Sequence, residues 1–312
     1  MNRIVFLGTP DFSVPALKAI VLQGYEVTLV VTQKDKKKGR GNIISKSPVK
    51  AAAEAFGIDV YQPVDVNSKE SLDLIRSHKP DFIVVIAYGQ ILSEEFLLIP
   101  QIECLNIHAS LLPKYRGAAP INWAIIKGET QTGIAIMKVE KGLDSGPIYK
   151  MESICLDDKI TAGELHDILM HIGARLIIEA LEEIKEKEIT PLKQDSSQVS
   201  YAPKLNKSMS LINWNQTCRA INNLIRGLDP WPGSVILYDS KKIKIFDTSY
   251  VLINHGKKPG TIIGVDEEGI RIACRDGYLM VREIQLSGKR RMTVKQFLLG
   301  NIIKTGYQLG DD

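Results

Sequence analysis

The sequence predicts an α/β fold with a mostly parallel sheet, followed by a smaller domain built as an antiparallel β-barrel. In the first half, apolar strand-like runs alternate with helix-like segments, which is typical of a parallel sheet. After residue 208, short strand-like runs separated by turn residues replace this alternation. A polar stretch with two prolines, residues 190–207, lies between the two patterns and is expected to be a linker. The predicted domains are therefore 1–189 and 208–312.

The first-half elements follow from runs of apolar residues and from helix start signals. Ser47 before Pro48 is a good helix start, because serine caps the first turn and proline fits its first position. Strands are expected, in chain order, at 3–8, 26–32, 58–61 and 81–88, then in a run that ends at 108, and then at 132–139 and 146–156. Helices are expected at 12–22, 48–55, 68–78, 119–128 and 162–187.

The second-half elements are shorter and closer together. A helix is expected at 215–228, and a terminal helix near 293–300. The strands of the barrel are expected at 234–238, 242–247, 260–265, 269–275 and 278–286. Their lengths and the turn residues between them favour an antiparallel sheet that closes on itself.

The composition describes an ordinary globular protein with a full core. Apolar residues make up 44% of the 312 residues and charged residues 24%. The four cysteines are far apart and form no CxxC pair, which argues against a zinc ribbon or a disulfide framework and suits a reducing compartment. No run approaches the roughly 18 apolar residues of a membrane span. We therefore expect a soluble cytoplasmic protein.

Positive charge is concentrated in two places. Residues 205–312 carry 16 Lys/Arg against 10 Asp/Glu, and residues 33–50 carry seven basic residues against one acid. This asymmetry indicates either a polyanionic partner or a solvated lysine-rich surface, and charge alone leaves both open.

Two common kinds of site are disfavoured. The turn after the first strand, GTPDFS (8–13), lacks two of the three glycines of the GxGxxG motif, which argues against a nicotinamide oxidoreductase. The histidines at 78, 166, 171 and 255 have no zinc-ligand spacing to one another or to cysteine, so no metal site is expected.

The strongest candidate site lies where the strand ending at residue 108 meets a proline-containing loop. Asn106 and His108 are two residues apart, so in a strand they project from the same face. They lie at the carboxyl end of a strand, where ligands bind in parallel sheets. Either they are the satisfied polar end of a core strand, or they are half of a reaction site. Asp144, between Gly142 and Gly146, is either a turn residue or a catalytic group.

Taken together, these segments resemble a known family. NIHASLLPKYRG (106–117) followed by GLDSG (142–146) is similar to the signature of the formyltransferases that use 10-formyltetrahydrofolate. GTPDF, the GRG-containing basic loop and AYGQIL (87–92) resemble those family members that act on methionyl-tRNA. The resemblance spans nearly the whole chain, although no individual residue is carried over beyond 234. It implies a Rossmann-like catalytic domain and an OB-like barrel that binds tRNA.

The resemblance implies a reaction and three catalytic residues. The formyl group on N10 of 10-formyltetrahydrofolate passes to the α-amino group of methionine on initiator tRNA, which gives N-formylmethionyl-tRNA for translation initiation. Asn106 would donate a hydrogen bond to the developing oxyanion, and His108 would donate another and shuttle a proton. Asp144 would orient His108 and help to remove the proton from the amine. Which of the two takes the proton, and whether through a water, stays open.

The resemblance also implies binding residues. The folate co-substrate would contact Ser110, Leu111, Leu112, Pro113, Ile86, Tyr88, Gly89, Ile91 and Leu92. The acceptor end of the tRNA would contact Lys36, Lys37, Lys38 and Arg40, which lie in a predicted loop, 34–46. No metal, no membrane and no obligate protein partner are expected, and the chain is expected to be a monomer.

Rival functions remain. A formyltransferase for an amino-sugar nucleotide and a formyl-folate hydrolase would share the central motif but are expected to lack the basic KDKKKGRG loop (34–41). A noncatalytic RNA-binding barrel is also conceivable, but its few aromatic residues (Tyr238, Phe246 and Tyr278) offer little base stacking, and it leaves the first domain unexplained.

Overall fold

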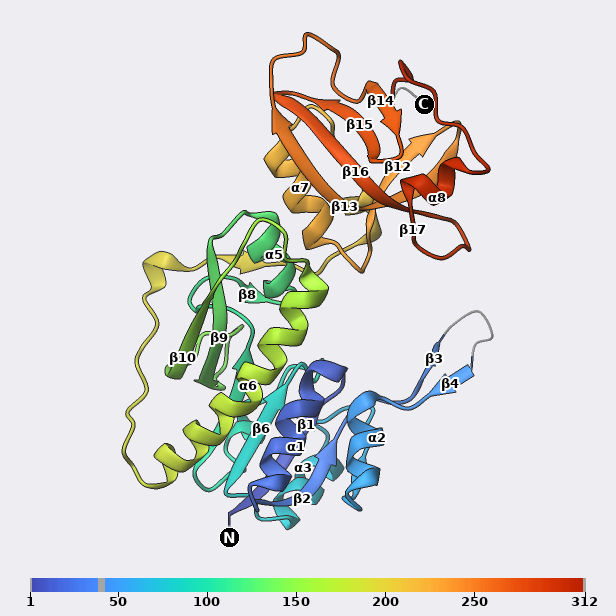
Figure 1. Cartoon of the computed structure of the whole chain (residues 1–312). Coiled ribbons are helices and arrows are strands. Elements are labelled where there is room, and N and C mark those ends of the chain that lie inside the picture. The colour runs from blue at the N-terminus through green and yellow to red at the C-terminus, as the bar shows by residue number, and fades with distance from the viewer. Residues whose placement is uncertain (1, 39–42, 311–312) are drawn as a thin grey trace. The chain divides into compact units, whose positions relative to one another are not determined.

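The computed structural model describes residues 2–38 and 43–310, and the chain divides into two compact units (Figure 1). The first unit comprises Met1–Gly117, Thr132–Ile154 and His166–Ala202. The second comprises Ala118–Gln131, Cys155–Leu165 and Pro203–Asp312. The chain thus passes between the units several times, whereas the sequence pattern predicts one passage through a linker.

A single twisted sheet organises the first unit. In the described part of the chain its seven strands follow the order β10-β9-β7-β6-β1-β2-β5. Their bounds are β1 Arg3–Gly8, β2 Glu26–Val31, β5 Val60–Tyr61, β6 Phe82–Ile86, β7 Glu103–His108, β9 Gln131–Lys138 and β10 Ile148–Cys155. The neighbouring strands β5, β2, β1, β6 and β7 pair in parallel, in that order across the sheet. The next strand, β9, pairs antiparallel to β7. The predicted mostly parallel α/β sheet is therefore confirmed.

The order of the strands creates a switch point at β1. The chain continues from β1 to β2 on one side, and later adds β6 and β7 on the other. In open α/β sheets, ligands bind beyond the carboxyl ends of the strands at such a point. Hydrogen bonds join the loops there: Ser13 Oγ donates to the Ile86 carbonyl at 2.8 Å, and Thr9 Oγ1 donates to the Tyr88 carbonyl at 3.0 Å.

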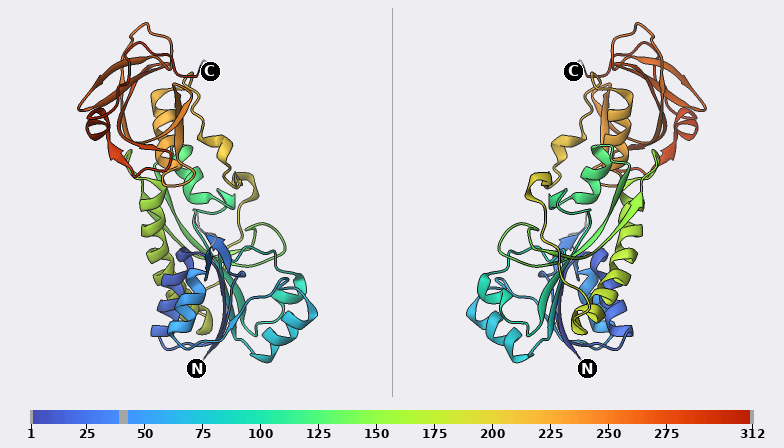
Figure 2. Two further views of the ribbon diagram at one scale, coloured as in Figure 1. Left: turned by 90° about the vertical axis from the view of Figure 1, so that its right-hand side faces the viewer. Right: turned by 90° about the vertical axis from the view of Figure 1, so that its left-hand side faces the viewer.

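Helices cover both faces of this sheet (Figure 2). On one face lie α1 Val14–Leu22, α2 Pro48–Ala55 and the long α6 Ala162–Lys185; on the other lie α3 Lys69–Ser77 and α4 Glu94–Leu97. Alternation along the strands explains the two-sided core, since neighbouring residues face opposite layers. Val5 and Leu7, for example, pack in one cluster with Ile75 of α3 and Phe96 of α4.

The basic segment differs from the predicted loop. Two short strands, β3 Lys36–Lys38 and β4 Ile43–Ser45, pair antiparallel with Lys36 opposite Ser45 (Figure 1). Lysines have a low strand propensity, so these strands gave no local signal. Arg40, with Gly39 and Gly41, lies outside the described residues.

The second unit contains the antiparallel sheet that the sequence predicts. Its strands follow the order β12-β13-β16-β15-β14, and β17 pairs with β16. The bounds are β12 Ser234–Tyr238, β13 Lys241–Leu252, β14 Ile262–Asp266, β15 Gly269–Cys274, β16 Gly277–Leu286 and β17 Met292–Thr293. The helices of this unit are α5 Pro120–Ile126, α7 Cys218–Gly227 and α8 Val294–Leu298. The inner face of the sheet packs with α7 around buried isoleucines such as Ile221 and Ile245.

The segment predicted as a linker has a structure of its own. It forms a short 3-10 turn, η2 Ser196–Gln198, and then β11 Tyr201–Ala202, which pairs in parallel with β8 Arg116–Gly117. A further 3-10 turn, η3, spans Lys207–Ser210. Residues 190–202 therefore belong to the first unit, whose loops they contact.

Candidate active site

Asn106 and His108 lie at the carboxyl end of β7, between the parallel β6 and the antiparallel β9. Asn106 is paired with Val85 and Met137, and His108 with Ala135. Their spacing places both side chains on one face of the sheet. Asn106 is half-buried, and its amide forms no side-chain hydrogen bond in the part of the chain that the structure describes. An N–H donor is thus available to a ligand at this point.

The backbone fixes the tautomer of His108. The side chain is only 6% exposed, and its Nε2 lies 2.9 Å from the carbonyl oxygen of Tyr115. A carbonyl can only accept, so Nε2 carries the hydrogen and donates it. In the neutral ring the unprotonated atom is therefore Nδ1, which lies 3.6 Å from Oδ2 of Asp144. His108 presents its basic nitrogen to a carboxylate.

Asp144 reaches His108 through the loop between β9 and β10. The loop leaves β9 after Lys138, which pairs with Leu105 of β7, and it then brings Asp144 within 3.6 Å of His108 at the carboxyl end of β7. Asp144 adopts a left-handed backbone with φ +47°, and its Oδ2 accepts a hydrogen bond from the Gly117 N–H at 2.8 Å. The structure therefore brings together two residues that the sequence alone could not join.

The predicted folate loop, residues 110–113, is partly committed to its own structure. Ser110 is fully buried, and its Oγ donates to the Lys114 carbonyl at 2.6 Å. Leu112 is also buried and packs against Ala135 and Met137. Leu111 and Pro113 are partly exposed. Ser110 thus shapes the loop, while the neighbouring apolar side chains offer a surface.

The other predicted folate segment, residues 86–92, follows β6 at the switch point. Ile86 and Tyr88 are buried, Leu92 packs partly against the core, and Ile91 is 89% exposed. Gly89 adopts φ +98°, a conformation that favours glycine. The Tyr88 hydroxyl is buried without a hydrogen-bond partner among the described residues, and burial raises the pKa of this phenol to about 12.

Family models and known relatives match nearly the whole chain. The formyl transferase model matches residues 2–181, and the model of the formyl transferase C-terminal domain matches residues 204–301. The methionyl-tRNA formyltransferase of Clostridium novyi is 48% identical over 97% of this chain and 98% of its own. The chain belongs to the methionyl-tRNA formyltransferase family.

Further comparisons agree with this assignment. The methionyl-tRNA formyltransferase of Clostridioides difficile is 47% identical over 99% of this chain and 100% of its own. Among solved structures, WlaRD, a sugar 3N-formyl transferase, matches with a TM-score of 0.70 and 22% identity over 93% of this chain and 99% of its own. At that identity the likeness shows the fold alone. Both the family predicted from the central motif and the predicted fold class are confirmed.

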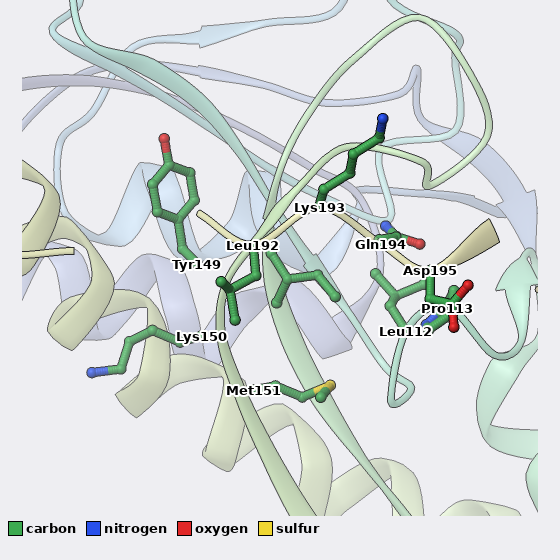
Figure 3. A pocket seen from close by; sticks show the side chains of 10 residues that line it. Leu112, Pro113, Tyr149, Lys150, Met151, Leu192, Lys193, Gln194 and Asp195 are labelled. Atoms are coloured by element: carbon green, nitrogen blue, oxygen red, sulfur yellow. The ribbon is translucent and has the colours of Figure 1, made fainter. Parts of the chain in front are cut away.

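Two residues of the 110–113 loop help to line a groove of ≈250 Å³ in this family member (Figure 3). Leu112 and Pro113 line it together with Ile148, Tyr149, Lys150, Met151, Leu192, Lys193, Gln194 and Asp195. The amine of Lys150 is engaged by Glu179 and Glu183. The groove shares the loop with the candidate site, but it lacks His108 and Asp144.

Sequence reasoning missed three residues beside the candidate site of this formyltransferase family member. Arg116 donates a hydrogen bond to Gln194, and Gln194 donates one to the Asp144 carbonyl. Ser200 accepts a hydrogen bond from the N–H of Tyr115, whose carbonyl accepts from His108. Gln194 and Ser200 lie in the predicted linker, where a polar residue carries no signal of a specific contact. Arg116 is part of the family motif, but its partner is remote in sequence.

The basic residues predicted to contact tRNA all come from the segment around β3. Lys36 is exposed, and Lys37 and Lys38 follow it on the same strand.

Within residues 2–38 and 43–310, no three His, Cys, Asp or Glu side chains are grouped so that they could hold a metal ion. None of the helices described is both long and apolar enough to cross a membrane.

Proposed function

We propose that this chain transfers the formyl group of 10-formyltetrahydrofolate to the α-amino group of methionine on initiator tRNA. The observation that carries the proposal is the match over nearly the full chain with methionyl-tRNA formyltransferases. The site geometry supports it, since Asn106, His108 and Asp144 meet at the carboxyl end of β7. We assign the catalytic role to these three residues.

The nucleophile needs little activation. An α-amino group has a pKa near 7.7–8.0, so a substantial fraction is neutral at neutral pH. The protein must mainly position the amine and stabilise the negative charge that develops on the formyl oxygen. The amide of Asn106 supplies a hydrogen-bond donor that is not used elsewhere in the described chain. One donor of this kind typically contributes about 2.7–4 kcal/mol to the lowering of the barrier.

His108 and Asp144 manage the proton. As the amine attacks, it becomes cationic and must lose a proton. Nδ1 of His108 can accept a proton because Nε2 is already committed to the Tyr115 carbonyl. The nearby carboxylate of Asp144 then faces an imidazolium, which it stabilises by charge attraction. The same pair can return the proton to the folate nitrogen that leaves.

The residues of the two folate segments suit a flat pterin ring. A pterin needs an apolar slot with a few polar groups at its edge. Leu111 and Pro113 are partly exposed and offer apolar surface in one segment, and the exposed Ile91 offers it in the other. Bound there, 10-formyltetrahydrofolate supplies the formyl group. We assign the pterin-binding role to residues 86–92 and 110–113, with Ser110 acting through the loop conformation.

Binding of tRNA is assigned to the two basic regions. Residues 33–50 carry a net charge of +6 and follow β2, so they start from the same edge of the sheet as the candidate site. Residues 205–312 carry another +6. We propose residues 1–189 as the catalytic part and 208–312 as the tRNA-binding part. All three catalytic groups come from one chain, so a monomer suffices, and the dispersed cysteines suit the cytoplasm.

A direct assay tests the function. The protein is incubated with 10-formyltetrahydrofolate and charged initiator methionyl-tRNA, and the methionyl ester is analysed by mass spectrometry. We expect a mass increase of one formyl group that depends on both substrates. Release of free formate without tRNA would instead identify a formyl-folate hydrolase, and transfer only to an amino-sugar nucleotide would identify the other rival. Either result would overturn the proposal.

A further inference from the structure

The segment that follows α6 contacts both sides of the candidate catalytic pair. We call residues 194–202 the brace segment. At one end, Gln194 reaches the loop that carries Asp144. At the other, Ser200 and β11 pair with the residues around β8, on which the position of His108 depends. All of these residues belong to the first unit.

Gln194 uses its whole amide. The side chain is 8% exposed, and its Nε2 donates to the carbonyls of Asp144 at 2.9 Å and Gly146 at 2.7 Å. Its Oε1 accepts from Nε of Arg116 at 3.1 Å and from Nη2 at 2.6 Å. Both donors and the acceptor are therefore satisfied. If the amide were turned over, its oxygen would face two carbonyl oxygens and its nitrogen would face the guanidinium, so that acceptor would meet acceptor and donor would meet donor. Only the orientation described here forms hydrogen bonds.

The other end of the brace segment forms hydrogen bonds with the backbone of Tyr115 and Arg116, and the Tyr115 carbonyl is the group that accepts from His108. The Tyr115 N–H donates to Ser200 Oγ at 3.0 Å, and the Arg116 N–H donates to the Ser200 carbonyl at 2.9 Å. The carbonyl of the same Tyr115 accepts from His108, and the next residue but one, Gly117, donates to Asp144. The brace segment thus bonds directly to the backbone of Asp144, and it reaches His108 through Tyr115.

The backbone at these contacts is strained. Tyr115 has φ +60° and Asp144 has φ +47°, both in the left-handed region that side chains disfavour. Gly146 approaches the Lys138 carbonyl so closely that an added Cβ would lie 2.0 Å from its oxygen. Strained residues keep such conformations only where the surroundings hold them. The donors of Gln194 bond to two carbonyls of this loop, at Asp144 and Gly146.

We infer that Gln194 is a positioning residue for formyl transfer: its amide, oriented by Arg116, fixes the 144–146 loop so that Asp144 faces Nδ1 of His108. The inference rests on the proposed function, because it needs Asp144 to act in the reaction. A displacement of about 1 Å in a reacting group can cost about 100-fold in rate. Loss of this anchor therefore affects turnover without removing any group that touches substrate.

The test compares three single variants under single-turnover conditions on methionyl-tRNA. Gln194→Leu removes the donors and the acceptor, while Gln194→Glu keeps an acceptor for Arg116 but loses the donors. We expect both to lower the rate of formyl transfer by about 10- to 100-fold, with tetrahydrofolate affinity within about 3-fold of the parent. The matched control is Gln198→Leu, because Gln198 is exposed and donates only to Asp195 within the same segment. Its rate should equal that of the parent.

A double-mutant cycle separates positioning from a general structural effect. If Gln194 acts through Asp144, then Gln194→Glu should cost little further rate once Asp144→Asn is present. Additive losses, or a Gln194→Glu variant as active as the parent, would overturn the inference. An Asp144→Asn variant that retained full activity would overturn the inference as well, because Asp144 would then have no role to support. The proposed function fails separately: in that case the parent itself would not formylate methionyl-tRNA. Thermal unfolding and circular dichroism of each variant confirm that the compared proteins are folded.

Discussion

At the scale of single residues, the candidate site depends on a backbone carbonyl. The carbonyl oxygen of Tyr115 holds the proton of His108 on Nε2, so the neutral ring has only Nδ1 as its base. That atom lies 3.6 Å from Oδ2 of Asp144, whose carboxylate is itself held by the Gly117 N–H. The direction in which the proton can travel is therefore set by the fold around β7 and β8.

Removal of any of the three proposed catalytic side chains should reduce formyl transfer. We expect Asn106→Ala, His108→Ala and Asp144→Ala each to lower kcat/KM by at least about 100-fold, because each removes a group that acts on the developing charge or its proton. Steady-state kinetics on methionyl-tRNA measure the effect, and circular dichroism checks the fold. Activity close to that of the parent in any two variants would refute the catalytic assignment.

The buried hydroxyl of Tyr88 gives a prediction about stability. Because this group has no hydrogen-bond partner among the described residues, Tyr88→Phe should raise the free energy of unfolding by roughly 1 kcal/mol at neutral pH. Burial raises the pKa of Tyr88 in the folded state to about 12 from 10.0, so the parent loses stability as the pH rises from about 10 to about 12. The variant should lose less over that range.

Urea unfolding at pH 8 and at several pH values above 10 measures both effects. The control is Tyr201→Phe. Tyr201 is 63% exposed, so this variant removes a hydroxyl group from an exposed side chain and not from a buried one. A Tyr88→Phe protein that is less stable than the parent at neutral pH would show that the hydroxyl has a bonding partner in solution.

Single residues also show how far sequence reasoning reaches. Asn106 and His108 were predictable as a pair because strand alternation is a local rule. The meeting of His108 with Asp144 was not, because the two residues are remote in sequence and the loop after β9 must fold so that they meet. Gln194 was wholly hidden, since its partners at 116, 144 and 146 are remote in sequence and a glutamine in a polar stretch has no distinctive pattern.

At the scale of elements, long periodic segments were predictable, and of the short strands only β5 was expected. The strands of the parallel sheet and α6 agree with the sequence pattern, because their core contacts repeat along the element. In contrast, β3, β8 and β11 have two or three residues each and depend on a partner strand for their conformation. The predicted basic loop accordingly contains two paired strands, β3 and β4, which we call the hairpin strands, on either side of residues 39–42.

The charge of the hairpin strands should govern affinity for tRNA. We expect the triple change Lys36→Gln, Lys37→Gln and Lys38→Gln to weaken tRNA binding and to flatten its dependence on salt, by about 0.7–0.9 log units for each phosphate that the variant no longer neutralises. Arg40→Ala should lower kcat/KM for formylation strongly and leave folate binding unchanged. Arg40→Lys should not restore it fully, because a lysine lacks the planar fork of arginine.

Kinetics on initiator tRNA at two salt concentrations measure these effects. A matched control removes three exposed lysines outside the hairpin strands, by Lys18→Gln, Lys69→Gln and Lys79→Gln. If the control variant loses as much affinity as the variant of the hairpin strands, then net charge explains the effect and the hairpin strands have no specific role.

At the scale of the whole molecule, the two units are interleaved along the chain. Besides residues 203–312, the second unit takes in α5 and the segment 155–165. The side chain of Asn122 on α5 donates to the Gly227 carbonyl of α7 at 2.8 Å, and Arg226 donates to the carbonyls of Asp157 and Ile160. Helix α7, which follows the predicted linker, thus forms hydrogen bonds with α5 and with the segment 155–165, which both precede the linker. Sequence reasoning placed those segments in the first domain, because their place in chain order fits the α/β alternation.

This interleaving changes what truncation should do. Judged from sequence pattern alone, residues 1–205 contain a complete α/β core and would fold independently. In the structure, such a fragment keeps α5 but loses Leu228 and Leu224, against which Ala119 and Trp123 pack. We expect it to retain tetrahydrofolate binding, since residues 86–92 and 110–113 lie in the first unit. We also expect it to melt at a lower temperature than the full chain and to bind a hydrophobic dye through the uncovered face of α5.

The same fragment should formylate tRNA poorly, because it lacks the +6 charge of residues 205–312. Low stability could by itself reduce activity, so the comparison includes the full-length variant Arg226→Met. That variant loses the bonds to the 157–160 carbonyls but keeps the basic region, and it should lower the melting temperature while its salt-dependent affinity for tRNA stays that of the parent. Melting curves and kcat/KM on tRNA, measured for all three proteins at two salt concentrations, separate stability from charge. A fragment that melts with the full chain and matches its kcat/KM would show that neither the packing of α5 on α7 nor the basic region is needed.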